Sequence, residues 1–499
     1  MRHKTIIAIA CLLSITGARA QDSLRTHIGY DLAAEAFAGT GDYNAYQLVT
    51  NRHHAVSTRP NTAYLRGAVN ISHTLAKDLV LKAEVDAIAT VHADHKLYLQ
   101  QCYANLSYKS FFLEAGSREQ PQVVRDNLLS IGSFVKGTNA KPVPQIHIGT
   151  KGFWDIPYTK GWVQANFEGG YGKMLDSDYR EKAFYRAPHV NPLYATGAYY
   201  HQKHLYFRTK PTMPFFVLVG IEHVAFFGGT SHIWEDGVLV TKEKGAKIKD
   251  FMNVILPIGD KNYFEHNALE DWSYGNHIGV MTYQFGVNID SHHRLQAYCD
   301  NPFEDGSGVR KGNGGDGLWG IQYSNSSPER QYVRGAVIEY FQSTNQCGPL
   351  HWDPNDYPEP IRSQITDKVV GDDNYYNHSF YDSYSHYGMT PGIALITSPI
   401  YNKNGDTRFL DSRVKAWHAG INGEITDRLS YLVKGSYREG WGTYWQPLPT
   451  KHHSLDAMIQ ATYKNGPWEI AGAFAFDKGN IYGDCSTFNL KIGYHGKIL

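Results

Sequence analysis

The chain has little cysteine, no surplus of charge of either sign and, after its first twenty residues, no long apolar run. Its 499 residues contain 48 Lys plus Arg and 48 Asp plus Glu. Without a basic surplus, little charge is available to neutralise phosphates, so nucleic acid is not an expected partner. Without an apolar run of about twenty residues, the mature chain is not expected to cross a membrane as a helix.

Signatures of catalysis are also missing. The chain contains no GxxxxGK[ST], HExxH, GxSxG or CxxC pattern. Glycoside hydrolysis needs two carboxylates facing each other across a cleft, and adjacent acidic residues in one turn do not provide that arrangement. We therefore expect a protein that is not an enzyme and that carries no cofactor and no metal.

The first twenty residues are typical of a secretory signal. Residues 2–4 are basic, 5–15 form a short apolar core, and Ala18-Arg19-Ala20 is a small-x-small cleavage site. Cys11 within this segment could indicate a lipoprotein, but the residues before it lack the expected pattern. The sequence thus predicts a signal peptide over 1–20 and export through the inner membrane of a Gram-negative bacterium.

Few cysteines follow this segment. An oxidising compartment permits disulfides between them, and the alternative is buried free thiols. We predict a Cys347–Cys485 bond, because both residues fall at loop ends on the same side of the topology derived below. The cysteines beyond the leader are Cys102, Cys299, Cys347 and Cys485.

What the chain does have is aromatic residues, with 35 Tyr, and glycine, with 48. Apolar and polar residues alternate strictly over 429–438, 455–464, 468–476 and 488–494. One apolar face and one polar face is what a strand needs between lipid and a wet lumen. A strand of a secreted soluble β protein shows the same period, so the alternation leaves both classes open.

Connection lengths favour the membrane class. If the last strand descends toward the periplasm, 464–467 is a short inner turn and 439–452 an outer loop, as in outer-membrane barrels. Two very long outer loops then fall near 226–276 and 343–412. This reading gives eighteen antiparallel strands and, because no linker divides 21–499, a single barrel domain whose lumen the long loops plug. The predicted strands cover 27–37, 62–74, 79–91, 96–106, 110–117, 144–152, 161–171, 203–209, 214–224, 278–289, 293–301, 316–323, 332–342, 413–424, 428–438, 453–463, 467–477 and 485–497.

Six segments of the chain carry a pattern of their own. They are VKGTNAKPVPQIHIG (135–149), YHQKHLYF (200–207), GIEHVAFFGGTS (220–231), NPFEDGSGVR (301–310), DGLWGIQ (316–322) and GDDNYYNHSFY (371–381). In this order they resemble the capsule assembly Wzi family in its Bacteroidetes-type members, over about residues 28–495. The resemblance implies an eighteen-stranded outer-membrane barrel that helps to attach or assemble capsular polysaccharide, lectin-like and without a reaction. It also implies outer-membrane lipids and the outer-membrane insertion machinery as partners.

The aromatic and amide-rich segment 371–387 is the first candidate for glycan binding. Planar amides and carboxylates bind vicinal hydroxyls, and aromatic faces stack on sugar rings. The alternative is a loop folded into the lumen, whose polar groups satisfy one another. The two readings are compatible, since a plug can form the floor of a binding surface. The candidate residues of this segment are Asp373, Asn374, Asn377, His378 and Tyr381.

Two further loops carry candidates. Glu304 and Asp305 could accept hydrogen bonds from sugar hydroxyls or bind a cation, or simply cap a Gly-rich turn. Trp445 could stack on glycan, whereas the nearby Trp and Tyr residues fit the aromatic girdle at the membrane interface. His223 could point to a ligand, but a lumen histidine satisfied by a neighbour is the simpler interpretation.

These observations predict an outer-membrane, lectin-like protein that binds capsular or other surface polysaccharide. Two alternatives stay open at this point. An eighteen-stranded barrel is wide enough to be a porin or glycan-uptake channel. An outer-membrane hydrolase using Glu304, Asp305 or His223 is the second alternative.

Overall fold

The structure of the chain is a computed structural model. It describes residues 26–93, 95–255, 274–304, 306–309, 311–346, 373–444 and 446–499. The predicted signal peptide, Asp305, Cys347 and Trp445 lie outside these residues.

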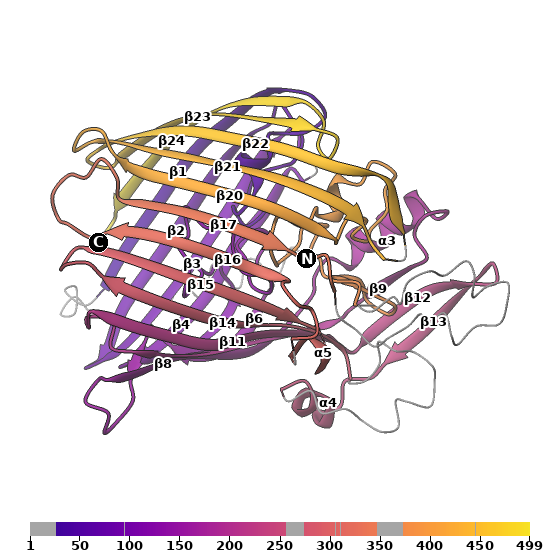
Figure 1. Cartoon of the computed structure of the whole chain (residues 1–499), viewed down its shortest axis with the longest axis horizontal. Helices are drawn as coiled ribbons and strands as arrows, with labels where there is room; N and C mark the ends of the chain where they lie inside the picture. Colours follow the sequence, from indigo (N-terminus) through magenta and orange to yellow (C-terminus); the bar gives the residue numbers. More distant parts are fainter. Residues whose placement is uncertain are drawn as a thin grey trace.

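A single antiparallel sheet closes on itself to form an eighteen-stranded barrel (Figure 1). β1 pairs with β2 along one edge and with β24 along the other, so the sheet has no free edge. The two-residue β7 (Trp154–Asp155) only extends the edge of β8. The barrel strands are β1 (Thr26–Thr40), β2 (Ala63–Ala76), β3 (Leu79–Val91), β4 (Leu97–Tyr108), β5 (Phe111–Ser117), β6 (Gln145–Thr150), β8 (Val163–Lys173), β10 (Tyr199–Thr209), β11 (Phe215–Phe227), β14 (Asn276–Asn288), β15 (His293–Phe303), β16 (Gly317–Asn325), β17 (Gly335–Gln342), β20 (Val414–Glu424), β21 (Leu429–Gly442), β22 (Pro447–Asn465), β23 (Trp468–Gly479) and β24 (Cys485–Lys497).

The wall of the barrel is apolar outside and polar inside. Leu455 and Ile459 of β22 are exposed on the outer face, whereas Asp456 between them is buried in the lumen. Phe474 and Ala475 of β23 divide in the same way. This distribution is the reverse of a soluble protein and is the one that a bilayer around the barrel requires. The predicted all-β barrel and its strand count are confirmed.

Turn geometry fixes the register of the hairpins. Between β22 and β23, Asn465 pairs with Trp468, which leaves Gly466 and Pro467 as the turn. Gly466 has φ +57°, a conformation in which glycine carries no steric penalty. The predicted short inner turn at 464–467 is therefore confirmed.

The lumen is filled at the outer end by three connections, 41–62, 118–144 and the described part of 343–413. Apolar residues of the second and third connections form one core with the wall: Phe134, Tyr376 and Leu395 pack in the same cluster as Val337 and Phe341. We call these three connections the plug. The prediction that the loop near 343–412 plugs the lumen is confirmed for its described part, 343–346 and 373–412.

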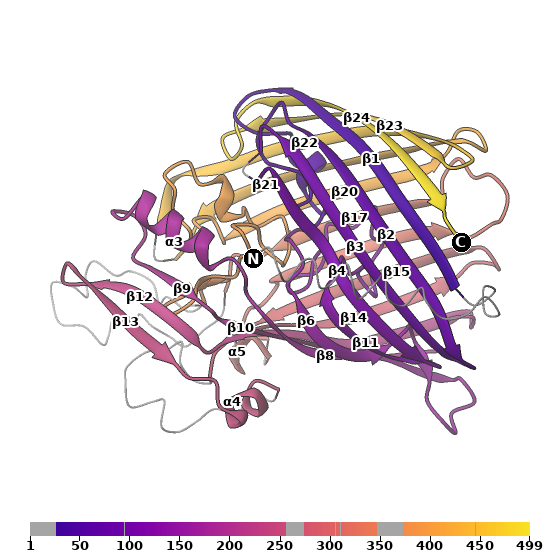
Figure 2. The same cartoon turned by 180° about the vertical axis from the view of Figure 1, so that it is seen from behind.

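The long loop near 226–276 behaves differently from what was predicted. Its described part forms β12 (Gly229–Glu235), β13 (Val238–Lys244) and α4 (Ile248–Asn253), which project beyond the barrel rim at the end opposite the C-terminus (Figures 1 and 2). A hairpin satisfies most of its own backbone hydrogen bonds, so it does not need the lumen wall. β12 also pairs with β9 (Leu193–Thr196) in a small three-stranded sheet.

Carboxylates of the wall hold the plug. Glu339 of β17 accepts hydrogen bonds from Ser130 Oγ at 2.6 Å and from the backbone N–H of Ile131 at 2.8 Å. Asp456 of β22 accepts from Gln47 Nε2 at 2.6 Å. Hydrogen bonds to a charged acceptor are stronger than neutral ones, so these contacts fix the plug against the barrel.

The remaining described elements are short and all lie in the outer connections. Among the residues that the structure describes, no helix is long and apolar enough to span a membrane. The elements are α2 (Tyr46–Val49), α3 (Ser177–Arg186), α5 (Gly306–Val309), β18 (Asn377–His378), β19 (Asp382–Ser383) and the 3-10 helix η5 (Pro399–Tyr401).

Cys485 corrects the predicted disulfide. Its side chain is buried and carries a free thiol, which donates a hydrogen bond to Asp477 Oδ2 at 2.9 Å. The predicted Cys347–Cys485 disulfide is therefore wrong, because Cys485 is a free thiol. Cys347 itself lies outside the described residues. The physical reason is that Cys485 is packed among residues of the wall and the plug, such as Tyr46 and Tyr401, where Asp477 takes its thiol proton in a hydrogen bond.

This thiol can be detected chemically. Alkylation of unfolded, unreduced protein is expected to modify the Cys485 peptide fully, because no disulfide blocks the sulfur. In the folded barrel the same thiol should stay unmodified, since it is buried. Peptide mass spectrometry measures both, and an unalkylated Cys485 in the unfolded protein would restore the disulfide prediction.

Candidate functional site

A pocket of about 210 Å³ lies at the outer mouth of the barrel, and most of its lining belongs to the plug connection 373–413. Three separate outer connections contribute to it, so it forms only when the barrel brings these loops together. Its lining combines amide, carboxylate, guanidinium and hydroxyl groups with a few apolar contacts, a composition typical of sites for polar ligands. The lining residues are Pro192, Leu193, Asn374, Asn377, His378, Ser379, Asp382, Arg408, Phe409, Leu410, Thr443 and Gln446.

Three of the predicted ligand-binding residues line this pocket: Asn374, Asn377 and His378. Tyr381 lies behind it, where its ring packs against Phe226 of the wall. Asp373 is not among the lining residues. The structure thus brings Asn374, Asn377 and His378 together at the pocket, while Asp373 and Tyr381 are not part of its lining.

Glu304 has a structural role in this arrangement. Its Oε1 accepts a hydrogen bond from the backbone N–H of Tyr376 at 3.2 Å, which ties the loop after β15 to the plug. It does not line the pocket. Asp305 and Trp445 lie outside the described residues, so their predicted roles stay predictions, although Thr443 and Gln446 on either side of Trp445 do line the pocket.

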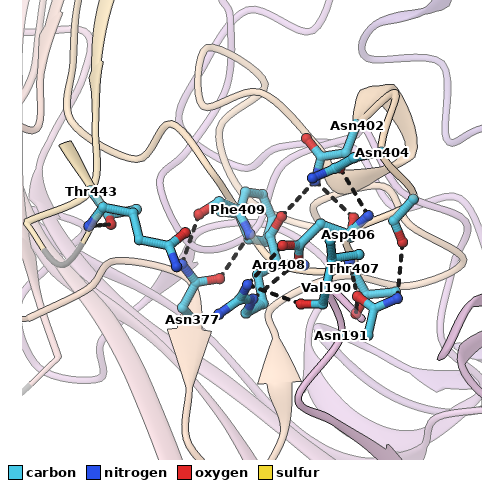
Figure 3. A network of polar contacts seen from close by, with 12 residues as sticks. Val190, Asn191, Asn377, Asn402, Asn404, Asp406, Thr407, Arg408, Phe409 and Thr443 are labelled. Atoms are coloured by element: carbon cyan, nitrogen blue, oxygen red, sulfur yellow. Dashed lines mark hydrogen bonds and ion pairs between the residues drawn. The ribbon is translucent and has the colours of Figure 1, made fainter. Parts of the chain in front are cut away.

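The Asn377 amide is fully engaged with the protein (Figure 3). Its Nδ2 donates to Asn374 Oδ1 at 3.0 Å and to the carbonyl of Phe409 at 2.8 Å. Its Oδ1 accepts from the backbone N–H of Phe409, also at 2.8 Å. Asn377 therefore joins the two chain segments that line the pocket, and acts as a positioning residue.

Arg408 presents a paired positive charge at the pocket (Figure 3). Its Nε and Nη2 donate to the two oxygens of Asp406 at 3.0 and 2.7 Å, and Nη2 also donates to the carbonyl of Val190. A bidentate pair of this kind fixes the guanidinium plane as well as its charge. Arg408 contributes a rigid edge to the pocket and little net charge.

Asp382 is the carboxylate of the pocket lining, and it was not among the residues predicted from the sequence. It is 2% exposed and sits at the turn of the β18–β19 hairpin, opposite His378. Its φ of +68° is in the left-handed region, which is rare for a non-glycine residue. Burial raises the pKa of its carboxyl to about 6, because loss of water disfavours the charged form. Its position inside the quoted segment 371–387 was the only available signal.

An aromatic surface adjoins the pocket beyond the barrel rim. Phe184 and Trp234 stack at 5.8 Å between ring centroids, and Tyr194 and His232 stack at 4.4 Å. The backbone N–H of Trp234 donates to the carbonyl of Pro192, which itself lines the pocket. Trp234 is 37% and nearby Tyr185 53% exposed. We call this surface, made by α3, β9 and β12, the aromatic shelf.

His223 follows the simpler of its two interpretations. Lys203 Nζ donates to His223 Nδ1 at 2.8 Å, and the other ring nitrogen is 3.0 Å from His277 Nδ1. The ring is buried in the lumen wall and is satisfied there. Within the described ranges, no group of three or more His, Cys, Asp or Glu side chains is arranged to hold a metal ion.

No family model matches the chain, and no curated protein matches it. Solved structures do. The chain is similar to Wzi of Escherichia coli, an outer-membrane protein involved in group 1 capsule assembly and a carbohydrate-binding β-barrel, with a TM-score of 0.54 and 9% identity over 97% of this chain and 88% of that one.

The chain also matches two barrels of Pseudomonas aeruginosa with lower scores. OccK5 (OpdH) has a TM-score of 0.46 and 9% identity, covering 96% of this chain and 100% of that one. The outer-membrane protein OprD has a TM-score of 0.45 and 9% identity, covering 95% and 94%.

The fold is that of an outer-membrane β-barrel. At 9% identity the similarity to Wzi supports a Wzi-like barrel and stops at the fold. The barrel architecture that the sequence motifs implied is therefore confirmed. The similarity does not extend to membership in the capsule assembly family.

Proposed function

We propose that this protein is an outer-membrane, lectin-like barrel of the capsule assembly Wzi type that binds capsular or other surface polysaccharide at its outer face. In this proposal the protein carries out no reaction and holds the polymer at the cell surface. A cleaved leader at 1–20, insertion by the outer-membrane machinery and a surrounding lipid bilayer complete the proposal.

The pocket is the observation that carries it. The plug connection 373–413 forms most of it, and its amide, carboxylate and guanidinium groups are the partners that sugar hydroxyls take. A channel for solutes would need an open lumen, whereas the cluster around Phe134, Tyr376 and Leu395 extends from the plug to the wall. The plug supports a binding protein over the porin alternative.

The aromatic shelf adds the second element of a glycan site. Exposed Tyr185 and Trp234 offer ring faces to pyranose rings at one side of the pocket. A polymer that enters the pocket with one unit can lie on the shelf with the next units. Repeated weak contacts along a polymer raise the overall affinity through effective concentration.

Deletion of the gene, followed by separation of cell-bound from released polysaccharide, tests the proposal. We expect the bound fraction to fall on deletion and to return with the wild-type gene. A Tyr185→Ala/Trp234→Ala double variant should restore it only in part, because loss of stacking worth about 1.4 kcal/mol weakens binding roughly tenfold.

The matched control is Tyr158→Ala, which removes an exposed tyrosine in the inner turn before β8. It should restore the bound fraction fully. A bound fraction that does not change when the gene is deleted would contradict the proposed function.

A further inference from the structure

Among the residues that the structure describes, Asp382 is a buried carboxylate with the Thr407 hydroxyl as the one side-chain donor close to it. Both of its oxygens are buried, and no described donor, Thr407 included, makes a hydrogen bond of good geometry to either of them. The side chain lines the pocket at the outer mouth of the barrel. An acceptor that is removed from water and left unpaired destabilises the folded state, so its position needs a reason beyond folding.

The donors that surround Asp382 are committed to other acceptors. The Thr407 hydroxyl donates to Asn191 Oδ1 at 3.1 Å. The Arg180 guanidinium pairs with Asp176 at 3.0 Å and donates to backbone carbonyls of the plug. Arg408 pairs with Asp406, as described above. The fold thus holds the Asp382 carboxylate in a fixed position, and its oxygens can accept hydrogen bonds from a ligand.

The backbone holds Asp382 in place with some strain. The β18–β19 hairpin pairs His378 with Asp382, and this pairing holds the residue at φ +68°. A non-glycine residue in this conformation is one that the surrounding structure imposes, and such residues gather at functional sites. The burial of Asp382, the shortage of donors around it and its backbone conformation all indicate that its carboxylate accepts hydrogen bonds from a ligand.

We infer that Asp382 binds a vicinal hydroxyl pair of a neutral sugar unit, with one hydroxyl donating to each carboxylate oxygen, and that this contact sets the specificity of the pocket. The inference rests on the proposed function and names the class of unit it takes. A uronate or sulfated unit at this position would place its own negative charge beside Asp382. Because Arg408 is already neutralised by Asp406, no free cation in the described pocket would offset that repulsion.

The test is binding of the purified barrel in detergent micelles to an array of neutral hexose oligosaccharides and of uronate oligosaccharides. The wild type should bind at least one neutral glycan and favour neutral over uronate chains. Asp382→Asn should weaken that binding at least tenfold. The matched control is Asp178→Asn, which removes one charge from the exposed face of α3 and should bind like the wild type.

Stability separates a lost contact from a lost fold. Because burial makes the charged form of Asp382 unfavourable, Asp382→Asn should unfold at the same temperature as the wild type or at a higher one. Normal neutral-glycan binding by Asp382→Asn overturns the inference and leaves the proposed function intact, as does a wild-type preference for uronate chains. Absence of glycan binding by every form overturns the proposed function, and the inference with it.

Acidification provides a second readout. The charged groups that face Asp382 are Arg180 of α3, Asp406 and Arg408 beside it, and the titratable His378 of β18. With a pKa of about 6, Asp382 gains its proton between pH 7 and pH 5. Neutral-glycan affinity of the wild type should fall over that range, and the Asp382→Asn variant should lack this step. A pH profile that is identical in both proteins would also overturn the inference.

Discussion

Excision of residues 378–408 is expected to convert a closed barrel into one that conducts ions. The excised segment contains most of the plug connection that crosses the lumen, including Leu395 of the central core. An eighteen-stranded barrel without its plug is wide enough to hold a water-filled channel. We expect the steady single-channel conductance in planar bilayers to rise roughly tenfold or more over that of the intact protein.

The structure makes this excision feasible. Asn377 and Phe409, the residues on either side of the cut, already exchange hydrogen bonds at 2.8 Å in both directions. A linker of two or three glycines can therefore join them without moving either end. The ring of Tyr376 lies 5.2 Å from that of Phe409, which further holds the two ends together.

The matched control removes a segment of the same kind from outside the lumen. Replacement of 231–242, the body of the β12–β13 hairpin, by a short glycine turn should leave the conductance at the wild-type level. A large steady conductance of the intact protein would contradict the plug and favour a porin. If the excised variant does not conduct, the connections 41–62 and 118–144 are sufficient to close the lumen.

The barrel was predictable from the sequence because its wall obeys a strict physical rule. Every strand separates lipid from the lumen, so its side chains alternate, and most inner turns are short, as at Gly466, with 151–162 and 326–334 as the longer exceptions. The largest boundary error shows the limit of that rule. β22 starts at Pro447 and not at 453, because a register shift after Gly440 lets the strand continue through prolines that suggest a loop.

The plug was only half predictable. The connections 41–62 and 118–144 carry no period that marks them as buried, and α2, with four residues, is too short to show one. Their burial depends on wall carboxylates such as Glu339, about two hundred residues away in the chain. Contacts at that separation are set by the closed barrel and leave no local pattern.

The site was predicted at the level of its segment. Aromatic crowding with amides marked 371–387, and three of its five candidates line the pocket. The roles within the segment could not be predicted from the sequence, because the role of Asn377 or of Asp382 depends on the hydrogen-bond partners that the fold places around it. The amide of Asn377 bonds to Phe409, whereas the donors near Asp382 bond to other acceptors: Thr407 to Asn191 and Arg408 to Asp406. These pairings exist only in the folded chain.

Arg438→Ala is expected to lower the free energy of unfolding by about 3–5 kcal/mol, the cost of leaving one partner of a buried pair alone. Arg438 on β21 is 0% exposed and lies 3.4 Å from Asp456 Oδ2. Its guanidinium also sits between two rings, 4.0 Å from the centroid of Tyr46 and 4.6 Å from that of Tyr482. Urea titration of the barrel in lipid vesicles measures the change.

The loss should appear first in the plug. Tyr46 belongs to α2, and its backbone N–H donates to Asp477 Oδ2 of the wall at 2.9 Å. Gln47 beside it donates to the same Asp456 that Arg438 neutralises. When Arg438 is removed, Asp456 becomes an uncompensated buried charge and Tyr46 loses its cation–π partner. Hydrogen exchange should therefore accelerate in 44–50 before it does so in β21.

A pair at the surface provides the control. Arg334 and Glu424 lie 3.0 Å apart near the inner rim, with side chains 24% and 32% exposed. Since water and salt screen such pairs, Arg334→Ala should cost about 1 kcal/mol or less. Equal losses for Arg334→Ala and Arg438→Ala would contradict the argument from burial.

The double variant Arg438→Met/Asp456→Asn identifies the origin of the loss. It removes both charges, keeps an apolar stem between Tyr46 and Tyr482, and leaves an amide for Gln47 to bond. If the cost of Arg438→Ala is that of a stranded carboxylate, the double variant should recover most of the lost stability, because a buried pair replaced on both sides leaves no unpaired charge. If the cost is instead that of the ring contacts, the double variant should recover little, and the guanidinium between the two tyrosines would be what holds α2 against the wall.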